Sequence, residues 1–164
     1  MNITNDLVTE YINRHYQPLN ERLGELRLIG ERDNVPIILK ETESFLNILL
    51  ALKCPKKILE VGTAIGYSAL YFAECCQNAE IYTIEKNEYA VKSARHNIAA
   101  ARLESRIHSL FGDGQEQIEK LRDQGIDGFD FVFIDAGTTT AYMIDYITQR
   151  NATYVTNAVL HARR

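Results

Sequence analysis

Acidic residues and glycines follow four short apolar segments in the middle of the chain. The first segment runs into residues 60–66 (EVGTAIG), and the second ends at Glu85. The third leads into residues 112–114 (GDG), and the fourth ends at Asp135. Glycine lets the backbone turn sharply and lets a ligand come close, and a carboxylate accepts two hydrogen bonds at once, which suits a cis-diol. These residue types predict a binding site for a polar ligand.

The glycine spacing in residues 60–66 differs from the dinucleotide-binding fingerprint. That fingerprint is G-x-G-x-x-G, whereas here Gly62 and Gly66 are preceded by an acid, Glu60. A carboxylate at this place would repel a pyrophosphate but suits a ligand that carries a cationic amino group. NAD-dependent oxidoreduction is therefore disfavoured, and an ordinary tight turn without a ligand is the alternative interpretation.

The three later acids have different candidate roles. Glu85 lies 23 positions after Gly62, near the offset at which an acid accepts hydrogen bonds from ribose hydroxyls. Asp113 either caps the following helix or receives an adenine amino group. Asp135 ends a buried apolar run, where an unpaired carboxylate is costly, so it could bind a metal, a substrate hydroxyl or a cofactor. Together the four sites fit an adenosine with a short charged tail and no phosphates, which is S-adenosylmethionine rather than NAD or ATP.

The alternation of apolar runs and helical stretches places these residues at one edge of a sheet. We expect strands over 57–61, 81–85, 106–111, 129–134 and 153–160, and helices over 67–77, 88–101, 115–122 and 141–148. This alternation predicts an α/β fold of the Rossmann-like type, with a mostly parallel sheet covered by helices on both faces. Ligands bind outside the carboxyl ends of such strands.

The first third of the chain is predicted to be helical. We expect helices around residues 7–15, 19–31 and 41–52, and in the last of them Phe45, Ile48, Leu49 and Leu52 share one face. The whole chain, 1–164, is predicted to be a single domain. It has a helical N-terminal cap over 1–53 and an incomplete Rossmann-like core over 54–164.

The composition is that of a globular protein expected in the cytoplasm. The 164 residues are 46% hydrophobic and 24% charged, and the net charge of −4 argues against a general basic coat for nucleic acid. No apolar run resembles a membrane span, and the N-terminus lacks a signal-peptide pattern, so no membrane partner is expected. Cys54, Cys75 and Cys76 lack the spacing of a disulfide framework or a zinc site and are expected to be buried thiols.

Four segments resemble the motifs of a known enzyme family. The runs EVGTAIGYS, IYTIE, FGDG and FVFIDA, in this order and spacing, resemble the metal-dependent O-methyltransferases of the catechol and caffeoyl-coenzyme A type. The resemblance covers roughly residues 5–136. The run GTAIGYS and the VPII stretch at 35–38 are most similar to the bacterial branch that methylates 5-hydroxyuridine in tRNA.

The resemblance implies a site for S-adenosylmethionine. Its methionine end would lie against the glycine turn, its ribose would be held by the acid after the second strand, and its adenine would lie near the GDG run. A loop before the first strand would cover the cofactor. The residues implied, in that order, are Glu60, Gly62, Thr63, Gly66, Ser68, Glu85, Asp113, Gly114 and Ile38.

The resemblance also implies a divalent metal, usually magnesium, at Asp135, which borders the cofactor and is the expected catalytic residue. The metal would bind the substrate oxygen and lower its proton affinity before that oxygen takes the methyl group. Asn157 and Ala158 stand where the family has an Asp-Asn pair. Asn157 is thus the second implied metal ligand, and magnesium binding is expected to be weakened. The family's final antiparallel strands are missing, so we interpret the C-terminus as divergent or truncated.

The expected function is an S-adenosylmethionine-dependent O-methyltransferase that converts 5-hydroxyuridine in tRNA to 5-methoxyuridine with Mg²⁺ assistance. Arg14, Arg22, Arg27 and Arg32 offer a basic face for RNA, or else an ordinary solvated helix surface. A small catechol-like diol is the alternative substrate. A chain that binds the cofactor, or itself, without catalysis is the third alternative. Because the family often pairs through its N-terminal helices, the resemblance also implies a homodimer.

Overall fold

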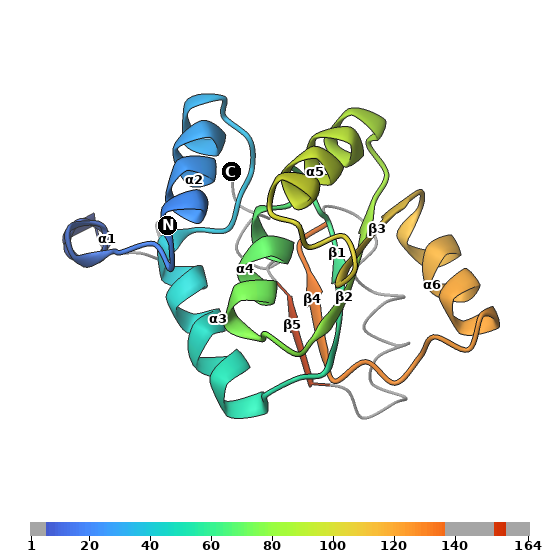
Figure 1. Ribbon diagram of the computed structural model, residues 1–164. Helices are drawn as coiled ribbons and strands as arrows, with labels where there is room; N and C mark the ends of the chain where they lie inside the picture. The colour runs from blue at the N-terminus through green and yellow to red at the C-terminus, as the bar shows by residue number, and fades with distance from the viewer. Residues whose placement is uncertain (1–5, 137–152, 157–164) are drawn as a thin grey trace.

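The computed structural model describes residues 6–136 and 153–156 and has a central sheet flanked by helices (Figure 1). In chain order the elements are α1 (Asp6–His15), α2 (Glu21–Arg32), α3 (Lys40–Lys53), β1 (Lys57–Val61), α4 (Tyr67–Cys75), β2 (Glu80–Glu85), α5 (Glu88–Ala100), β3 (Ile107–Phe111), α6 (Gly114–Asp123), β4 (Phe131–Ile134) and β5 (Thr153–Thr156). The three helices that precede β1 confirm the predicted helical N-terminal part.

The described strands form one parallel sheet in the order β3-β2-β1-β4-β5. Val61, at the end of β1, lies opposite Ile84 of β2 and Ile134 of β4. The chain therefore moves outward from β1 to β3 and then returns to the other side of β1 with β4. Such a reversal of strand order is where α/β folds bind ligands. The predicted parallel α/β fold is confirmed.

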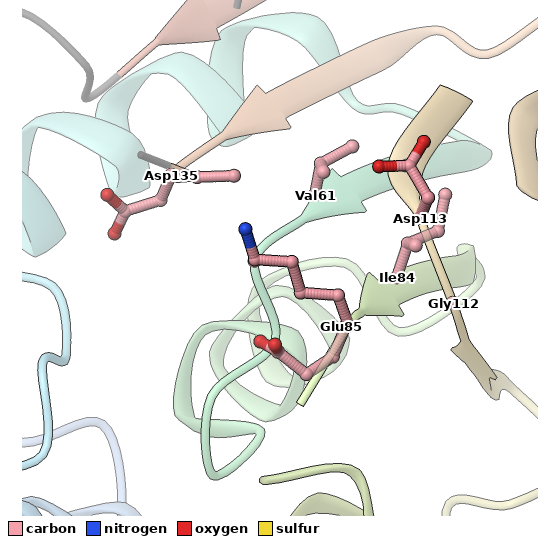
Figure 2. Close-up of a pocket in the computed structure, with 10 residues that line it drawn as sticks. Val61, Ile84, Glu85, Gly112, Asp113 and Asp135 are labelled. Carbon is pink, nitrogen blue, oxygen red and sulfur yellow. The ribbon is translucent and has the colours of Figure 1, made fainter. Parts of the chain in front are cut away.

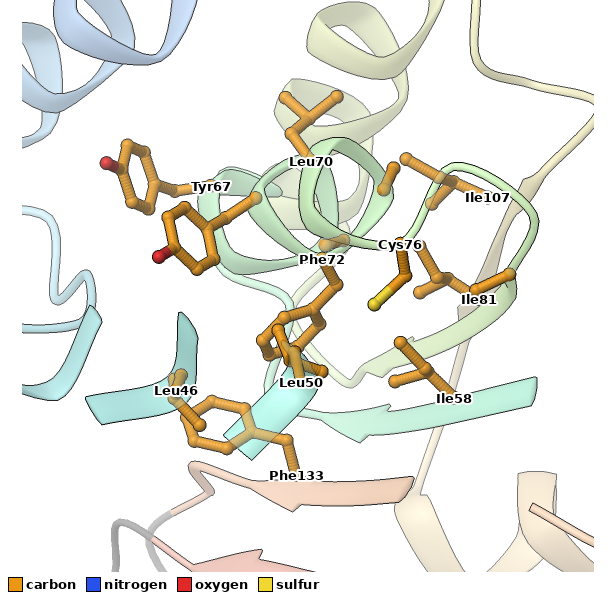
Figure 3. Packing of buried hydrophobic residues seen from close by; sticks show 14 of the residues in the cluster. Leu46, Leu50, Ile58, Tyr67, Leu70, Phe72, Cys76, Ile81, Ile107 and Phe133 are labelled. Carbon is orange, nitrogen blue, oxygen red and sulfur yellow. The ribbon is translucent and has the colours of Figure 1, made fainter. Parts of the chain in front are cut away.

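Both faces of the sheet are buried, which explains why its strands are apolar runs rather than alternating ones. On one face, Phe72 of α4 packs edge-on against Phe131 and Phe133 of β4, with ring centroids 6.2 and 5.5 Å apart. Figure 3 shows Phe72 and Phe133 in this cluster. On the other face, Ile118 and Leu121 of α6 belong to a second buried cluster with residues of β1, β2 and β4.

The predicted boundaries agree with the structure, with small local differences. The strand over 57–61 is confirmed residue for residue. The helix expected from residue 19 begins at Glu21, because the side chain of Asn20 accepts a hydrogen bond from the N–H of Leu23 at 2.9 Å and caps α2. The fifth strand is confirmed over Thr153–Thr156. The helix expected over 141–148 and the strand residues 157–160 lie outside the described residues.

The predicted apolar face of α3 is largely exposed. The side chains of Phe45, Ile48 and Leu52 are 54%, 59% and 79% exposed, whereas Leu46 and Leu50 are buried in the core. The face with Phe45, Ile48 and Leu52 therefore points away from the core, and the face with Leu46 and Leu50 packs against it. The homodimer through these helices stays a prediction. Among the described helices, none combines the length and the apolarity needed to cross a membrane.

Candidate functional site

A cavity of about 180 Å³ lies at the carboxyl ends of β1, β2 and β4 and beside the loop after β3 (Figure 2). The aligned register of these strands brings their last residues to this one place. The described residues that line it carry three carboxylates and one ammonium group, so this part of its wall has a net negative formal charge. Its lining residues are Val61, Gly62, Ile84, Glu85, Lys86, Gly112, Asp113, Gly114, Asp135 and Ala136.

The glycine turn after β1 is shaped by close packing of the chain. Gly62 has φ +103°, and a Cβ placed on it would stand 2.5 Å from the carbonyl oxygen of Asp135. Gly66 has φ +83°, and a Cβ there would be 3.3 Å from Cα of Ala94 in α5. Only glycine fits a left-handed backbone pressed so closely against neighbouring main chain. The turn is therefore held between β4 and α5.

Glu85 connects the end of β2 to this turn. Its Oε2 accepts a hydrogen bond from the N–H of Ala64 at 3.1 Å, and its Oε1 accepts one from the N–H of Asn87 at 2.8 Å. Ala64 has φ +46°, an uncommon conformation for a residue with a Cβ. Each carboxylate oxygen has a second lone pair, so Glu85 can still accept hydrogen bonds from a ligand in the cavity.

Asp113 serves as the cap of α6, one of the two roles expected for it. Its Oδ1 accepts hydrogen bonds from the N–H groups of Gln115 and Glu116 at 2.9 and 3.4 Å. Asp113 and Gly114 also line the cavity. In Figure 2, Asp113 and Asp135 lie on opposite sides of the cavity. The capping role is thus confirmed, and the adenine contact stays a prediction.

Glu60, Thr63 and Ser68 are buried and do not line the cavity. The Glu60 carboxylate accepts a hydrogen bond from the hydroxyl of Thr83, which also bonds the hydroxyl of Thr63. Burial raises the pKa of Glu60 to about 7, although Ser68 and Thr83 oppose this by hydrogen bonding. The nearby negative charges of Asp135 and Glu85 raise it further. A contact between Glu60 and the cofactor's amino group stays a prediction.

Ile38 lies in a different part of the molecule from the strand-end cavity. Its side chain is buried, and the residue lines a second, larger cavity of about 530 Å³ between α1, α2 and residues 34–41. Its carbonyl oxygen accepts a hydrogen bond from Nη2 of Arg27 at 3.0 Å. The structure thus brings together Gly62, Glu85, Asp113, Gly114 and Asp135, but not Ile38.

Sequence reasoning missed half of the cavity lining. Four of the missed residues, Val61, Ile84, Gly112 and Ala136, are chain neighbours of predicted ones and contribute apolar surface or backbone. The fifth, Lys86, supplies the only ammonium group among the described residues that line the cavity. Its position directly after Glu85 at a strand end was the signal that could have identified it.

The described residues do not by themselves form a metal site. Asp135 lines the cavity, but within 6–136 and 153–156 no group of three or more His, Cys, Asp or Glu residues could hold an ion. Asn157, the other implied ligand, lies outside the described residues. Since magnesium prefers several hard oxygen ligands, the described part of the chain supplies too few for a complete site.

The predicted basic face for RNA is wrong at Arg27. This side chain is buried and forms an ion pair with Glu43, because α2 packs against α4 on that side. Arg14 and Arg32 are exposed, but Arg14 pairs with Glu10 at 2.9 Å and Arg32 with Asp33 at 2.7 Å. Only Arg22 of the four is exposed without such a pair among the described contacts.

Comparison with known proteins identifies relatives for most of the chain. Residues 15–150, which include every residue that lines the strand-end cavity, match the family model described as O-methyltransferase. The chain is 34% identical over 93 residues to the catechol O-methyltransferase of Niastella koreensis, a match that covers 56% of this chain and 42% of that protein. The chain thus spans less than half the length of this curated relative.

Two solved structures share the fold over most of the chain. One is a Staphylococcus aureus protein described as a candidate caffeoyl-CoA O-methyltransferase, with a TM-score of 0.83 and 30% identity over 96% of this chain and 76% of that one. The other is the O-methyltransferase of Bacillus cereus in complex with S-adenosylhomocysteine, with a TM-score of 0.77 and 25% identity over 88% of this chain and 67% of that one.

The turn after β1 predicts a large effect of Gly62→Ala. Gly125→Ala is the matched control, because Gly125 has φ +75° but a Cβ there meets nothing within 4 Å. We expect the control to lose about 1 kcal/mol from left-handed strain. Gly62→Ala should lose a further ~1–3 kcal/mol because its Cβ meets the main chain of Asp135. Urea unfolding measures the free energy of unfolding of both variants. Equal losses would show that the close approach of residue 62 to Asp135 does not affect stability.

The buried Glu60 predicts a pH-dependent stability. Its pKa is about 7 in the folded protein against 4.5 ordinarily, so between these values the native state keeps a proton that the unfolded chain has lost. The free energy of unfolding therefore falls as the pH rises through this window. Relative to Glu60→Gln, the wild type should lose roughly 2–4 kcal/mol between pH 4.5 and 8. Urea unfolding across this pH range measures the loss, with the exposed Glu104→Gln as the control. If the free energy of unfolding has the same pH dependence in the wild type and in Glu60→Gln, the raised pKa of Glu60 is contradicted.

Proposed function

Because the chain belongs to the O-methyltransferase family, we propose that it binds S-adenosylmethionine in the strand-end cavity and directs its methyl group to an oxygen atom. The observation that carries this proposal is the charge of the cavity, where Glu85, Asp113 and Asp135 outnumber Lys86. Such walls favour a cation over a phosphate-bearing cofactor. The absence of the G-x-G-x-x-G fingerprint agrees with this choice.

The lining residues fit the parts of this cofactor. Glu85 has lone pairs left to accept hydrogen bonds from two vicinal ribose hydroxyls. Gly62 offers main chain without a side chain in the way, next to the end of β1. Asp113 and Gly114 form the opposite wall, where an uncharged adenine would lie. When bound, S-adenosylmethionine supplies a sulfonium methyl group, which an acceptor hydroxyl takes in line while the sulfur keeps the bonding electrons and the hydroxyl proton is released to water.

For the acceptor we propose a planar ring with two neighbouring oxygens. Both substrates suggested by sequence motifs have this chemistry, 5-hydroxyuridine in tRNA and a catechol-like diol. The motifs at 35–38 and 62–68 support tRNA, whereas the name of the Niastella koreensis relative supports a catechol. The loss of Arg27 from the predicted basic face removes one argument for RNA.

We also propose that magnesium assists the reaction. Asp135 is the described residue that would contribute a carboxylate. A second ligand at Asn157 would add an uncharged oxygen, which binds magnesium less strongly than a carboxylate. We therefore expect a weak dependence of activity on the ion, seen as partial loss on addition of a chelator.

The proposed cofactor site predicts that Glu85→Ala weakens binding of S-adenosylhomocysteine. Removing charge-assisted hydrogen bonds to the ribose should cost about 1–3 kcal/mol, or roughly 5- to 150-fold in Kd. Isothermal titration calorimetry measures this, with Glu104→Ala as control because Glu104 is exposed after α5. An unchanged Kd in Glu85→Ala would remove Glu85 from the site.

The acceptor is tested by offering both substrates to the protein with S-adenosylmethionine. We expect tRNA that carries 5-hydroxyuridine to gain the mass of one CH₂ in the modified nucleoside, as measured by mass spectrometry after digestion. Free catechol is the parallel reaction, and each is run with and without a chelator. Methylation of catechol alone would favour the diol. If the protein binds the cofactor but methylates neither acceptor, both proposed substrates are contradicted, and the alternative of a cofactor-binding protein without catalysis is favoured.

A further inference from the structure

A buried ion pair joins the N-terminal helices to the segment that follows the glycine turn. Arg27 of α2 and Glu43 of α3 are 4% and 3% exposed and are bonded through Nη2 and Oε2. Taking two charges out of water is expensive, and such a pair is favourable only when further hydrogen bonds satisfy both groups. The further hydrogen bonds of Arg27 and Glu43 therefore show which segments this ion pair connects.

Besides Glu43, the guanidinium group of Arg27 bonds to three other segments of the chain. Its Nε donates to the hydroxyls of Tyr16 and Tyr67 at 3.0 and 3.2 Å, and its Nη2 donates to the carbonyl oxygen of Ile38 at 3.0 Å. Tyr67 in turn donates to Glu43 at 2.7 Å. The planar guanidinium presents five donors in a fixed fork, so one side chain can serve all of these acceptors.

Two of these partners are connected to the glycine turn after β1. Tyr67 is the first residue of α4 and directly follows Gly66 of the glycine turn. Ile38 follows Ile37, whose side chain stands 3.1 Å from the position that a Cβ on Gly30 would take. The side chain of Ile65, within the glycine turn, is 3.4 Å from the same position. Residues 37–38 thus pack next to the turn, on one side of α2.

We propose that Arg27 is a positioning residue for cofactor binding, acting through Ile38 and Tyr67. It ties the backbone of residues 37–38 and the start of α4 to the same guanidinium, which keeps the glycine turn in its binding shape before the ligand arrives. Without Arg27, the Ile38 carbonyl loses its donor and Glu43 is left as a buried charge. Part of the binding free energy would then be used to order this region, which lowers the affinity for the cofactor. The inference rests on the proposed function.

The test compares Arg27→Met with Arg106→Met. Arg106 is a matched arginine: it is partly buried and donates to the carbonyl oxygens of Ala73, Cys76 and Ala79 at 3.1, 2.6 and 3.2 Å. It lies directly before β3, at the end of the sheet opposite the cavity. Both variants should lower the free energy of unfolding. Only Arg27→Met should raise the Kd for S-adenosylhomocysteine, by roughly 2- to 30-fold.

Tyr67→Phe keeps the test decisive if Arg27→Met folds poorly, and two further measurements extend it. Tyr67→Phe removes one hydroxyl of the cluster and keeps the ring and the ion pair, so it should raise the Kd by a smaller factor and lower the free energy of unfolding less than Arg27→Met does. Hydrogen exchange of the amides in residues 35–38 should quicken in Arg27→Met and not in Arg106→Met. Arg27→Lys, which keeps the charge but not the fork, should bind with an intermediate Kd.

The outcomes distinguish a failure of the proposed function from a failure of the role proposed for Arg27. If the wild-type protein does not bind S-adenosylhomocysteine, the proposed function is wrong, and the role of Arg27 in cofactor binding is wrong with it. If the wild type binds and Arg27→Met and Tyr67→Phe bind equally well, the inference alone is overturned. An equal rise in Kd for Arg106→Met would also overturn it, because the effect would then follow stability rather than position.

Discussion

The approach of Gly62 to the carbonyl oxygen of Asp135 is the constraint on which the site depends. A Cβ at residue 62 would stand 2.5 Å from that oxygen, so β1 and β4 can end side by side only with glycine there. The N–H of Asp135 bonds back to the carbonyl of Val61 at 2.9 Å. These contacts place the turn after β1 beside Asp135, which directly follows β4, and together with Glu85 at the end of β2 they form one wall of the cavity.

Electrostatics then decides which ligands that wall can accept. Parallel strands gather their terminal acids at one edge of the sheet, and here three carboxylates face one ammonium group. Glu60 lies behind them, where burial and the neighbouring charges raise its pKa to about 7. Placing carboxylates this densely disfavours further negative charge. The arrangement suits a sulfonium cofactor and is poorly suited to a pyrophosphate.

The N-terminal helices act at a distance from this wall. Arg27 and Glu43 are 16 residues apart in the chain and meet because α2 and α3 both pack against α4. Their ion pair gives the helices a connection to Ile38 and to Tyr67 at the start of α4. Helices that cover an α/β core can therefore influence ligand binding without lining the cavity.

The sequence alone determined the order of elements and the five predicted residues that meet at the cavity. Buried parallel strands need continuous apolar runs, and strand-end glycines and acids follow them directly, so both are local signals. Tertiary structure decided the orientation of α3, the burial of Arg27, and the places of Glu60 and Ile38 away from the cavity. These depend on which helix face meets the core and on partners far apart in the chain. Residue type and spacing specify neither the helix face that meets the core nor the distant partner of a residue.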